Sequence, residues 1–180
     1  MVETTLTGRL IVAAPPLVDP NFRRCVVLLL HHGADGALGV ILNRPSEVAV
    51  AVTLQDWDRF AAQPSVVFVG GPVEPNAVIG LGCRRGSMDV EGWQQVIGEL
   101  GMLDLSRSPD EIGLDEVRLF AGHAGWAAGQ LEAEVAAGSW FVVEAEPGDA
   151  FSSEPEGLWQ HVLRRQGGVY RTFPHDPSLN

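Results

Sequence analysis

One glycine-rich segment constrains the fold of this 180-residue chain more than any other. It follows the apolar run 117–121, which is typical of a strand, and residues 122–129 read G-H-A-G-W-A-A-G. Good helix formers follow at 130–137, and Gly138 stands where a glycine often ends a helix. The pattern predicts a strand, a glycine-rich turn and the start of a helix, with Trp126 in the turn.

This turn is also a candidate site. Glycines let a backbone bend sharply or approach another group closely, and a helix N-terminus can hold an anion. Trp126 and Gln130 are its candidate ligand-binding residues, and the glycines beside Trp126 leave it little cover within its own segment. We nevertheless expect the turn to be architectural first: Trp126 would anchor it against the sheet, and Gln130 would bond a neighbouring strand.

Apolar runs bounded by turn residues predict the remaining strands. The turn Gly33–Gly36, with its Asp-Gly pair, predicts a β-hairpin. Helical spacing predicts a helix capped by Thr53, a short helix that begins at Ser108, and a longer C-terminal helix. The strands are expected at 6–14, 24–31, 38–42, 66–69, 78–81, 140–143 and 169–173, with two more inside 93–105, and the helices at 53–61, from 108, and at 155–166.

The order of these elements defines the fold class. Strands dominate, helices are few, and there is no regular strand–helix alternation, which favours an α+β fold with a mixed sheet. The length matches one domain, and we assign residues 1–180 to it.

Composition excludes several functions. The formal net charge of −11 argues against direct nucleic-acid binding, because contacts to phosphates need a basic face. The chain has no lysine, which excludes a lysine Schiff base and a Walker A motif. There is no G-x-S-x-G motif, so a hydrolase of the α/β type is not expected.

Neither a metal nor a cofactor is expected. The five histidines lack metal-ligand spacing, and the adjacent His31 and His32 would face opposite sides of a strand. The two cysteines, Cys25 and Cys83, are far apart, and we expect a buried Cys25 and no disulfide. The N-terminus lacks the features of a signal peptide and no apolar run reaches 18 residues, so we expect a cytoplasmic protein without a membrane partner.

Four segments, in this order and spacing, resemble the bacterial AlgH/YqgE family of largely uncharacterised proteins. They lie at 8–22, 39–45, 70–73 and 122–140, and the resemblance extends from Gly8 to Gly168. It implies an α+β fold with a barrel-like mixed sheet and flanking helices, and a cytoplasmic bacterial protein. The family name carries a claimed role in transcriptional regulation, without an established reaction.

Three functions stay open. The first is a non-catalytic binding or regulatory protein with a pocket, for a small molecule or a protein, where the four segments meet. The second is an enzyme, a hydrolase or a transferase, acting on a small polar or anionic substrate, and the third is a protein–protein interaction module. Polar residues at strand ends near glycine-proline turns often build sites on a rigid sheet. The further candidate ligand-binding residues are therefore Asp19, Asn43, Arg44, Gly71 and Pro72.

An enzyme would show polar groups that converge in a cleft, with perturbed carboxylates, whereas a partner-binding module would expose an apolar patch.

Overall fold

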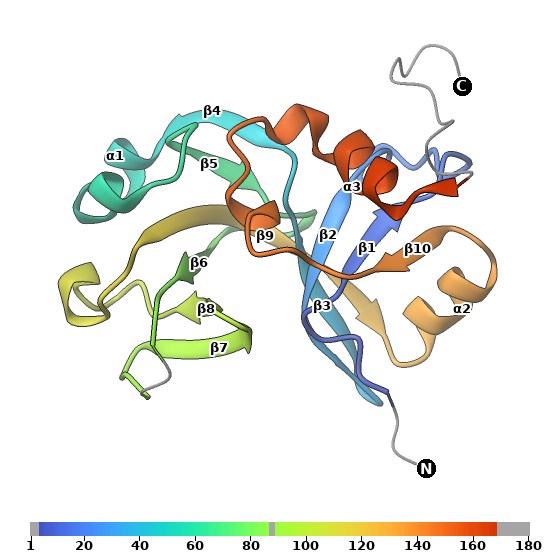
Figure 1. Ribbon diagram of the computed structural model, residues 1–180, viewed down its shortest axis with the longest axis horizontal. Helices are drawn as coiled ribbons and strands as arrows, with labels where there is room; N and C mark the ends of the chain where they lie inside the picture. The colour runs from blue at the N-terminus through green and yellow to red at the C-terminus, as the bar shows by residue number, and fades with distance from the viewer. Residues whose placement is uncertain (1–3, 87–88, 169–180) are drawn as a thin grey trace.

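A single curled sheet of ten strands forms the body of the computed structural model, which describes residues 4–86 and 89–168 (Figure 1). The strands are β1 Leu10–Ala13, β2 Val26–Gly33, β3 Gly36–Ile41, β4 Pro45–Ala49, β5 Val66–Val69, β6 Val73–Cys83, β7 Trp93–Ile97, β8 Leu100–Leu103, β9 Glu116–Ala127 and β10 Trp140–Val143. The α-helices are α1 Val50–Thr53, α2 Gln130–Ala136 and α3 Leu158–Gln166. The 3₁₀ helices are η1 Gln55–Phe60, η2 Pro109–Glu111, η3 Asp149–Phe151 and η4 Pro155–Gly157.

The long strand β9 connects the two halves of the sheet. The strand order is β10-β1-β2-β3-β9-β6-β8-β7, and β4 and β5 form a side branch on β9. β9 is antiparallel to β3 and β6 but parallel to β5, so the sheet is mixed. In Figure 1, β9 runs from the half that holds β6–β8 into the half that holds β1–β3 and β10. The expected α+β class with a mixed, barrel-like sheet is confirmed, the barrel being a half-barrel.

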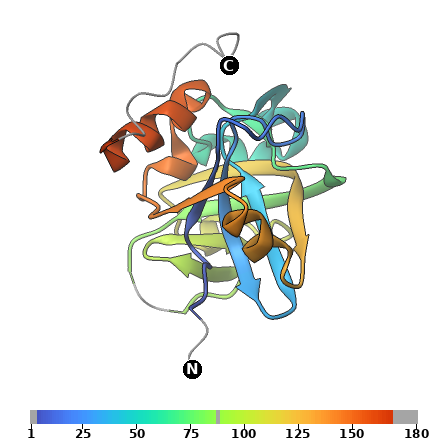
Figure 2. The same ribbon diagram turned by 90° about the vertical axis from the view of Figure 1, so that its right-hand side faces the viewer.

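The strands of the first half are apolar on both faces because both faces are covered. Successive side chains of a strand point to opposite faces. In β2, Leu28 packs into the cluster that contains Trp159 and Val162 of α3, whereas Val27 packs into the cluster that contains Leu131 of α2. In Figures 1 and 2 the two helices lie apart, with β1 and β10 between them.

A third apolar cluster lies in the second half. Trp57 of η1 and Ile112, which follows η2, pack against Val117 and Leu119 of β9. The region predicted as one helix at 53–61 is instead α1 followed by η1, and Thr53 ends α1 rather than capping a helix. Its expected apolar positions nevertheless face this cluster.

Several strands and the C-terminal helix match the sequence prediction closely. The β2–β3 hairpin and the two short strands β7 and β8 are confirmed. The C-terminal helix begins with one 3₁₀ turn and ends before Gly167, with its four expected apolar residues buried. The expected strand at 169–173 lies outside the described residues.

The glycine-rich turn predicted at 122–129 is confined to residues 128–129, directly before α2, because β9 continues through Gly122 and Trp126 to Ala127. The reason is a fork in the sheet. β3 pairs with β9 at Gly39–Ala124, and then the end of β5 enters between the two strands: Ile41 N–H donates to the Gly70 carbonyl, and Gly70 N–H donates to the Ala121 carbonyl, both at 2.8 Å. β9 thus changes partner without turning.

Glycines make this fork possible because three backbone segments approach within contact distance. A Cβ atom on Gly70 would lie 2.2 Å from the Gly122 carbonyl oxygen, and one on Gly71 would lie 2.2 Å from the His123 carbonyl carbon. Gly122 itself has φ +74°, and a Cβ there would lie 2.4 Å from the Gly71 oxygen. The glycines of two of the motifs therefore serve backbone contact.

Arg118 of β9 fixes two segments to the sheet from inside, the loop before β5 and the segment around η3. It is 2% exposed, and its guanidinium donates to the carbonyls of Ala150, Ser152 and Gln63 at 3.2, 2.9 and 2.8 Å. The group also lies over the Phe68 ring, 4.2 Å from the centroid. Burial lowers the pKa of Arg118 to about 10, so the side chain is still charged at neutral pH.

We predict that Arg118→Met lowers the free energy of unfolding by about 2–4 kcal/mol, because it leaves buried carbonyl oxygens without their charged donor. Chemical denaturation measures this. Arg59→Met is the control, since the Arg59–Asp110 ion pair is exposed and should contribute less than about 1 kcal/mol. Equal effects of the two substitutions would show that Arg118 is not a structural clamp.

Candidate functional site

Asn43 follows β3 and binds the start of β2. Its Oδ1 accepts from Val26 N–H, and its Nδ2–H donates to the Arg24 carbonyl, both at 2.9 Å. The amide therefore acts like one more residue of the sheet ladder, where the two strands separate. Both ends of this candidate side chain are committed to the backbone.

Arg44 ties the loop of Asp19 to the fork. Its guanidinium donates to the backbone carbonyls of Asn21 and Arg23, and its own carbonyl accepts from Val69 N–H at 2.8 Å. The Asp19 carboxylate accepts from Asn21 N–H at 2.8 Å, so its bond is local to the loop. The structure thus brings Asn43 and Arg44 to the strand that leads into Gly70 and Gly71, and it links Asp19 to them through the loop backbone.

Pro72 and its neighbours expose apolar surface beside the fork. Gly71 is buried against β9, but Pro72 is exposed, and Val69 and Val73 are 42% and 40% exposed. We call Val69, Pro72 and Val73 the fork surface.

Trp126 and Gln130 form a second group at the other end of the first half. Trp126 is 6% exposed, as expected for a side chain that anchors its segment against the sheet. Its cover comes from distant segments, because Phe22 and Trp140 lie with ring centroids 6.2 and 5.9 Å from that of Trp126. Gln130 Oε1 accepts from Ala127 N–H of β9 at 3.0 Å, the contact that the sequence predicted.

Glu134 of α2 satisfies both buried indoles. Its Oε2 accepts from Trp126 Nε1–H and from Trp140 Nε1–H, each at 2.9 Å, and its Oε1 accepts from Gln130 Nε2–H at 3.0 Å. Buried indole N–H groups need such partners. This carboxylate therefore holds β9, β10 and α2 together.

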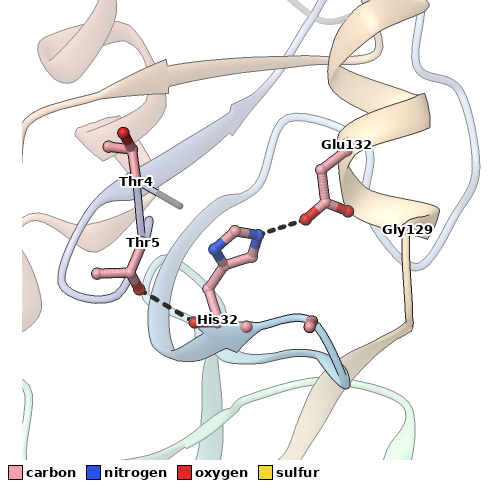
Figure 3. A pocket seen from close by; sticks show the side chains of 7 residues that line it. Thr4, Thr5, His32, Gly129 and Glu132 are labelled. Carbon is pink, nitrogen blue, oxygen red and sulfur yellow. Dashed lines mark hydrogen bonds and ion pairs between the residues drawn. The ribbon is translucent and has the colours of Figure 1, made fainter. Parts of the chain in front are cut away.

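A hollow of about 560 Å³ lies beside this group (Figure 3). It is lined by the end of β2, the start of α2 and the N-terminal segment, and in its wall His32 Nε2 lies 2.6 Å from Glu132 Oε1. The lining residues are Thr4, Thr5, His32, Gly33, Ala34, Gly129 and Glu132. Sequence reasoning missed this pair, since 100 positions separate the two residues and no local pattern connects them.

The hydrogen bonds fix the state of His32. Leu6 N–H donates to Nδ1 at 3.0 Å, so Nδ1 is the acceptor and Nε2 carries the proton that it donates to Glu132. Neither ring nitrogen is left for a substrate, and a general base needs one. His31 lies apart from this pair, bonded to Asp35 at 2.9 Å.

The shifted carboxyl groups do not have the character of catalytic acids. The pKa of Glu132 is lowered, first by a backbone hydrogen bond at its own amide and then by the bond to His32. The pKa values of Asp35 and Asp104 are also lowered, chiefly by hydrogen bonds from His31 and Ser106. All three carboxylates are exposed, whereas a general acid at neutral pH needs a raised pKa.

The cysteines are both free, and Cys25 is buried as expected. Burial raises the pKa of the Cys25 thiol to about 12 and also raises that of Cys83, so neither is an activated nucleophile. Within residues 4–86 and 89–168, no three histidine, cysteine or acidic side chains could share a metal ion. In the same ranges, no helix has the length and apolar character to cross a bilayer.

We predict that Trp126→Ala lowers the free energy of unfolding by about 3–5 kcal/mol, as expected for truncating a buried aromatic ring. The ring packs between Phe22 and Trp140, and its loss also leaves Glu134 with one donor fewer. Chemical denaturation is compared with that of Gln95→Ala, an exposed position on β7. A loss below about 1 kcal/mol, as at surface positions, would contradict the architectural role.

Comparison with known proteins identifies the family. A family model described as AlgH-like matches residues 10–171. A UPF0301 protein of Streptomyces coelicolor is 50% identical over 186 residues, which cover 98% of this chain and 96% of that protein. A UPF0301 protein of Thermobifida fusca is 45% identical over 194 residues, which cover 100% of this chain and 98% of that protein.

Two solved structures share the fold. The crystal structure of a Corynebacterium diphtheriae protein has a TM-score of 0.88 at 34% identity, over 95% of this chain and 93% of that one. The solution structure of the AlgH protein from Pseudomonas aeruginosa has a TM-score of 0.70 at 29% identity, over 98% of both chains. The resemblance seen in the four segments is confirmed, and this chain belongs to the AlgH-like family.

Proposed function

We propose that this protein is a non-catalytic, cytoplasmic binding protein that holds a protein partner at the fork surface. One observation carries the proposal. The polar candidate side chains around the fork bond to their own chain, while Val69, Pro72 and Val73 beside them face solvent. A rigid polar frame around exposed apolar residues is suited to binding, since apolar surface gains from removal from water.

The commitments of the polar groups argue against an enzyme. Asn43 and Arg44 use their donors on backbone carbonyls, and Gln130 bonds Ala127 and Glu134. His32 has both ring nitrogens bonded. To act in catalysis, each of these side chains would first have to break a hydrogen bond that stabilises the fold, and only then could it contact a substrate.

The charge argues for a protein rather than a nucleic acid as partner. A formal net charge of −11 repels phosphates, and the buried Arg118 is turned toward carbonyls inside the molecule. An influence on transcription, as the family name claims, would therefore pass through a partner protein and not through direct contact with DNA. We assign this activity to one AlgH-like domain over residues 1–180.

We predict that Val73→Asp weakens partner binding at least about tenfold, equivalent to about 1.4 kcal/mol, because it places a charge in a surface that becomes dry on binding. The measurement is quantitative affinity capture from a bacterial extract with the parent and variant proteins as bait. Val52→Asp is the matched control, since Val52 is 82% exposed but lies on α1, outside the fork surface. Both variants should melt within a few degrees of the parent, because both positions are exposed.

Identical capture profiles for the parent, Val69→Asp and Val73→Asp would contradict the proposal. If Val52→Asp reduced partner binding as much as Val73→Asp does, the binding surface would lie outside the fork surface.

We also predict that the protein binds duplex DNA no more tightly than about 10⁻⁴–10⁻⁶ M at physiological salt, the range of nonspecific contacts. Fluorescence anisotropy with a labelled duplex of mixed sequence tests this. Submicromolar binding would contradict the expectation from the net charge of −11 and would favour a direct regulator instead.

A further inference from the structure

The N-terminal residues 4–7 lie along β2, and His32 is where they are fastened. Thr5 Oγ1–H donates to the His32 carbonyl at 3.0 Å, and His32 N–H donates to Thr7 Oγ1 at 2.9 Å. Leu6 N–H donates to the His32 ring at Nδ1, at 3.0 Å. We call residues 4–7 the strap, and Figure 3 shows its Thr4 and Thr5 on one side of His32 and Glu132 on the other.

The bond from Leu6 requires a neutral imidazole. A neutral ring has one acceptor nitrogen, whereas both nitrogens of the cation carry a proton. Protonation of His32 would point Nδ1–H at Leu6 N–H, so the acceptor is lost and two donors face each other. The side chain of His32 is 10% exposed, which leaves little room for water to replace the lost partner.

Glu132 favours the opposite state. Its carboxylate accepts from Nε2–H at 2.6 Å, and a positive ring would turn this hydrogen bond into an ion pair. Among the residues that the structure describes, the charged groups of the same hairpin are His31 and Asp35, which pair with each other at 2.9 Å. From β3, the residue opposite His32 is Ala37, and the strap consists of Thr4, Thr5, Leu6 and Thr7, all without charge.

The strap also has a hinge. Gly8 has φ +82°, a conformation that suits glycine, and it stays attached to β2 because its N–H donates to the Leu29 carbonyl at 2.8 Å. Beyond the hinge, Leu29 N–H donates to the Arg9 carbonyl at 3.0 Å. The residues after Gly8 thus belong to the sheet. The three hydrogen bonds that join the strap to β2 all involve His32, while its other bonds stay within the N-terminal segment, among them Arg9 N–H to the Leu6 carbonyl at 2.9 Å.

We propose that the strap is a pH-sensitive cover, closed while His32 is neutral and released when His32 is protonated and pairs with Glu132. The bond from Leu6 is present at pH values above the titration of His32 and is lost as the pH falls through it. Release opens the hollow between β2 and α2 and frees the backbone N–H and carbonyl of His32. This inference uses no residue of the fork surface and is independent of the proposed partner binding.

Amide hydrogen exchange by NMR between pH 8 and pH 5 tests the proposal. The readout is the exchange rate of the Leu6 amide divided by that of the Leu29 amide, each corrected for its intrinsic rate. We expect this ratio to rise about tenfold or more across the titration of His32, which is followed in the same samples by its Cε1–H resonance.

Two variants separate titration from general loosening. His32→Gln offers a carbonyl oxygen to Leu6 but does not titrate, and its ratio should stay constant with pH. Glu132→Gln removes the charge that favours the protonated ring, so in this variant the exchange ratio should rise only at lower pH. A constant ratio in the parent would overturn the proposal, whether His32 is protonated in this range or stays neutral, and so would an equal rise in His32→Gln.

Discussion

The fork at β9 is the contact on which the rest of the sheet depends. β3 and β9 separate where Gly70 hydrogen-bonds to both of them, and Gly71 and Gly122 let the backbones meet without side chains between them. A residue with a Cβ atom at any of these positions would clash with backbone, which cannot yield as a flexible side chain can. Two half-sheets become one curved sheet at this point, and the candidate residues Asn43 and Arg44 lie at its border.

The polar groups of this protein mainly stabilise this curved sheet and the segments packed on it. Glu134 satisfies two indoles, Arg118 satisfies three carbonyls, and Asn43 extends a ladder of backbone bonds. Such groups are costly when left unpaired in a core, so a chain that buries them must place their partners with care. The side chains of the fork surface face solvent, whereas these polar groups are bonded within the protein. Because of this difference we assign the fork surface to binding.

Local patterns foretold much of the fold, because they depend on neighbours in the chain. The β2–β3 hairpin, strands β7 and β8, and the apolar face of α3 all follow from spacing and turn residues. What failed depends on distant segments. The glycines after residue 121 resemble a turn unless the arrival of Gly70 is known. The sequence predicted that Trp126 anchors its segment, but it could not name Trp140 as the neighbouring ring.

The position of β9 late in the sequence has a consequence for folding. Strands β3, β5 and β6 are all synthesised before residue 116, yet each pairs with β9. Until that strand leaves the ribosome, their edges offer unpaired backbone groups to any neighbouring chain. Contacts between residues so far apart also slow the search for the native pairing. The nascent chain therefore passes through a stage in which the strands that will form its centre are those most open to wrong association.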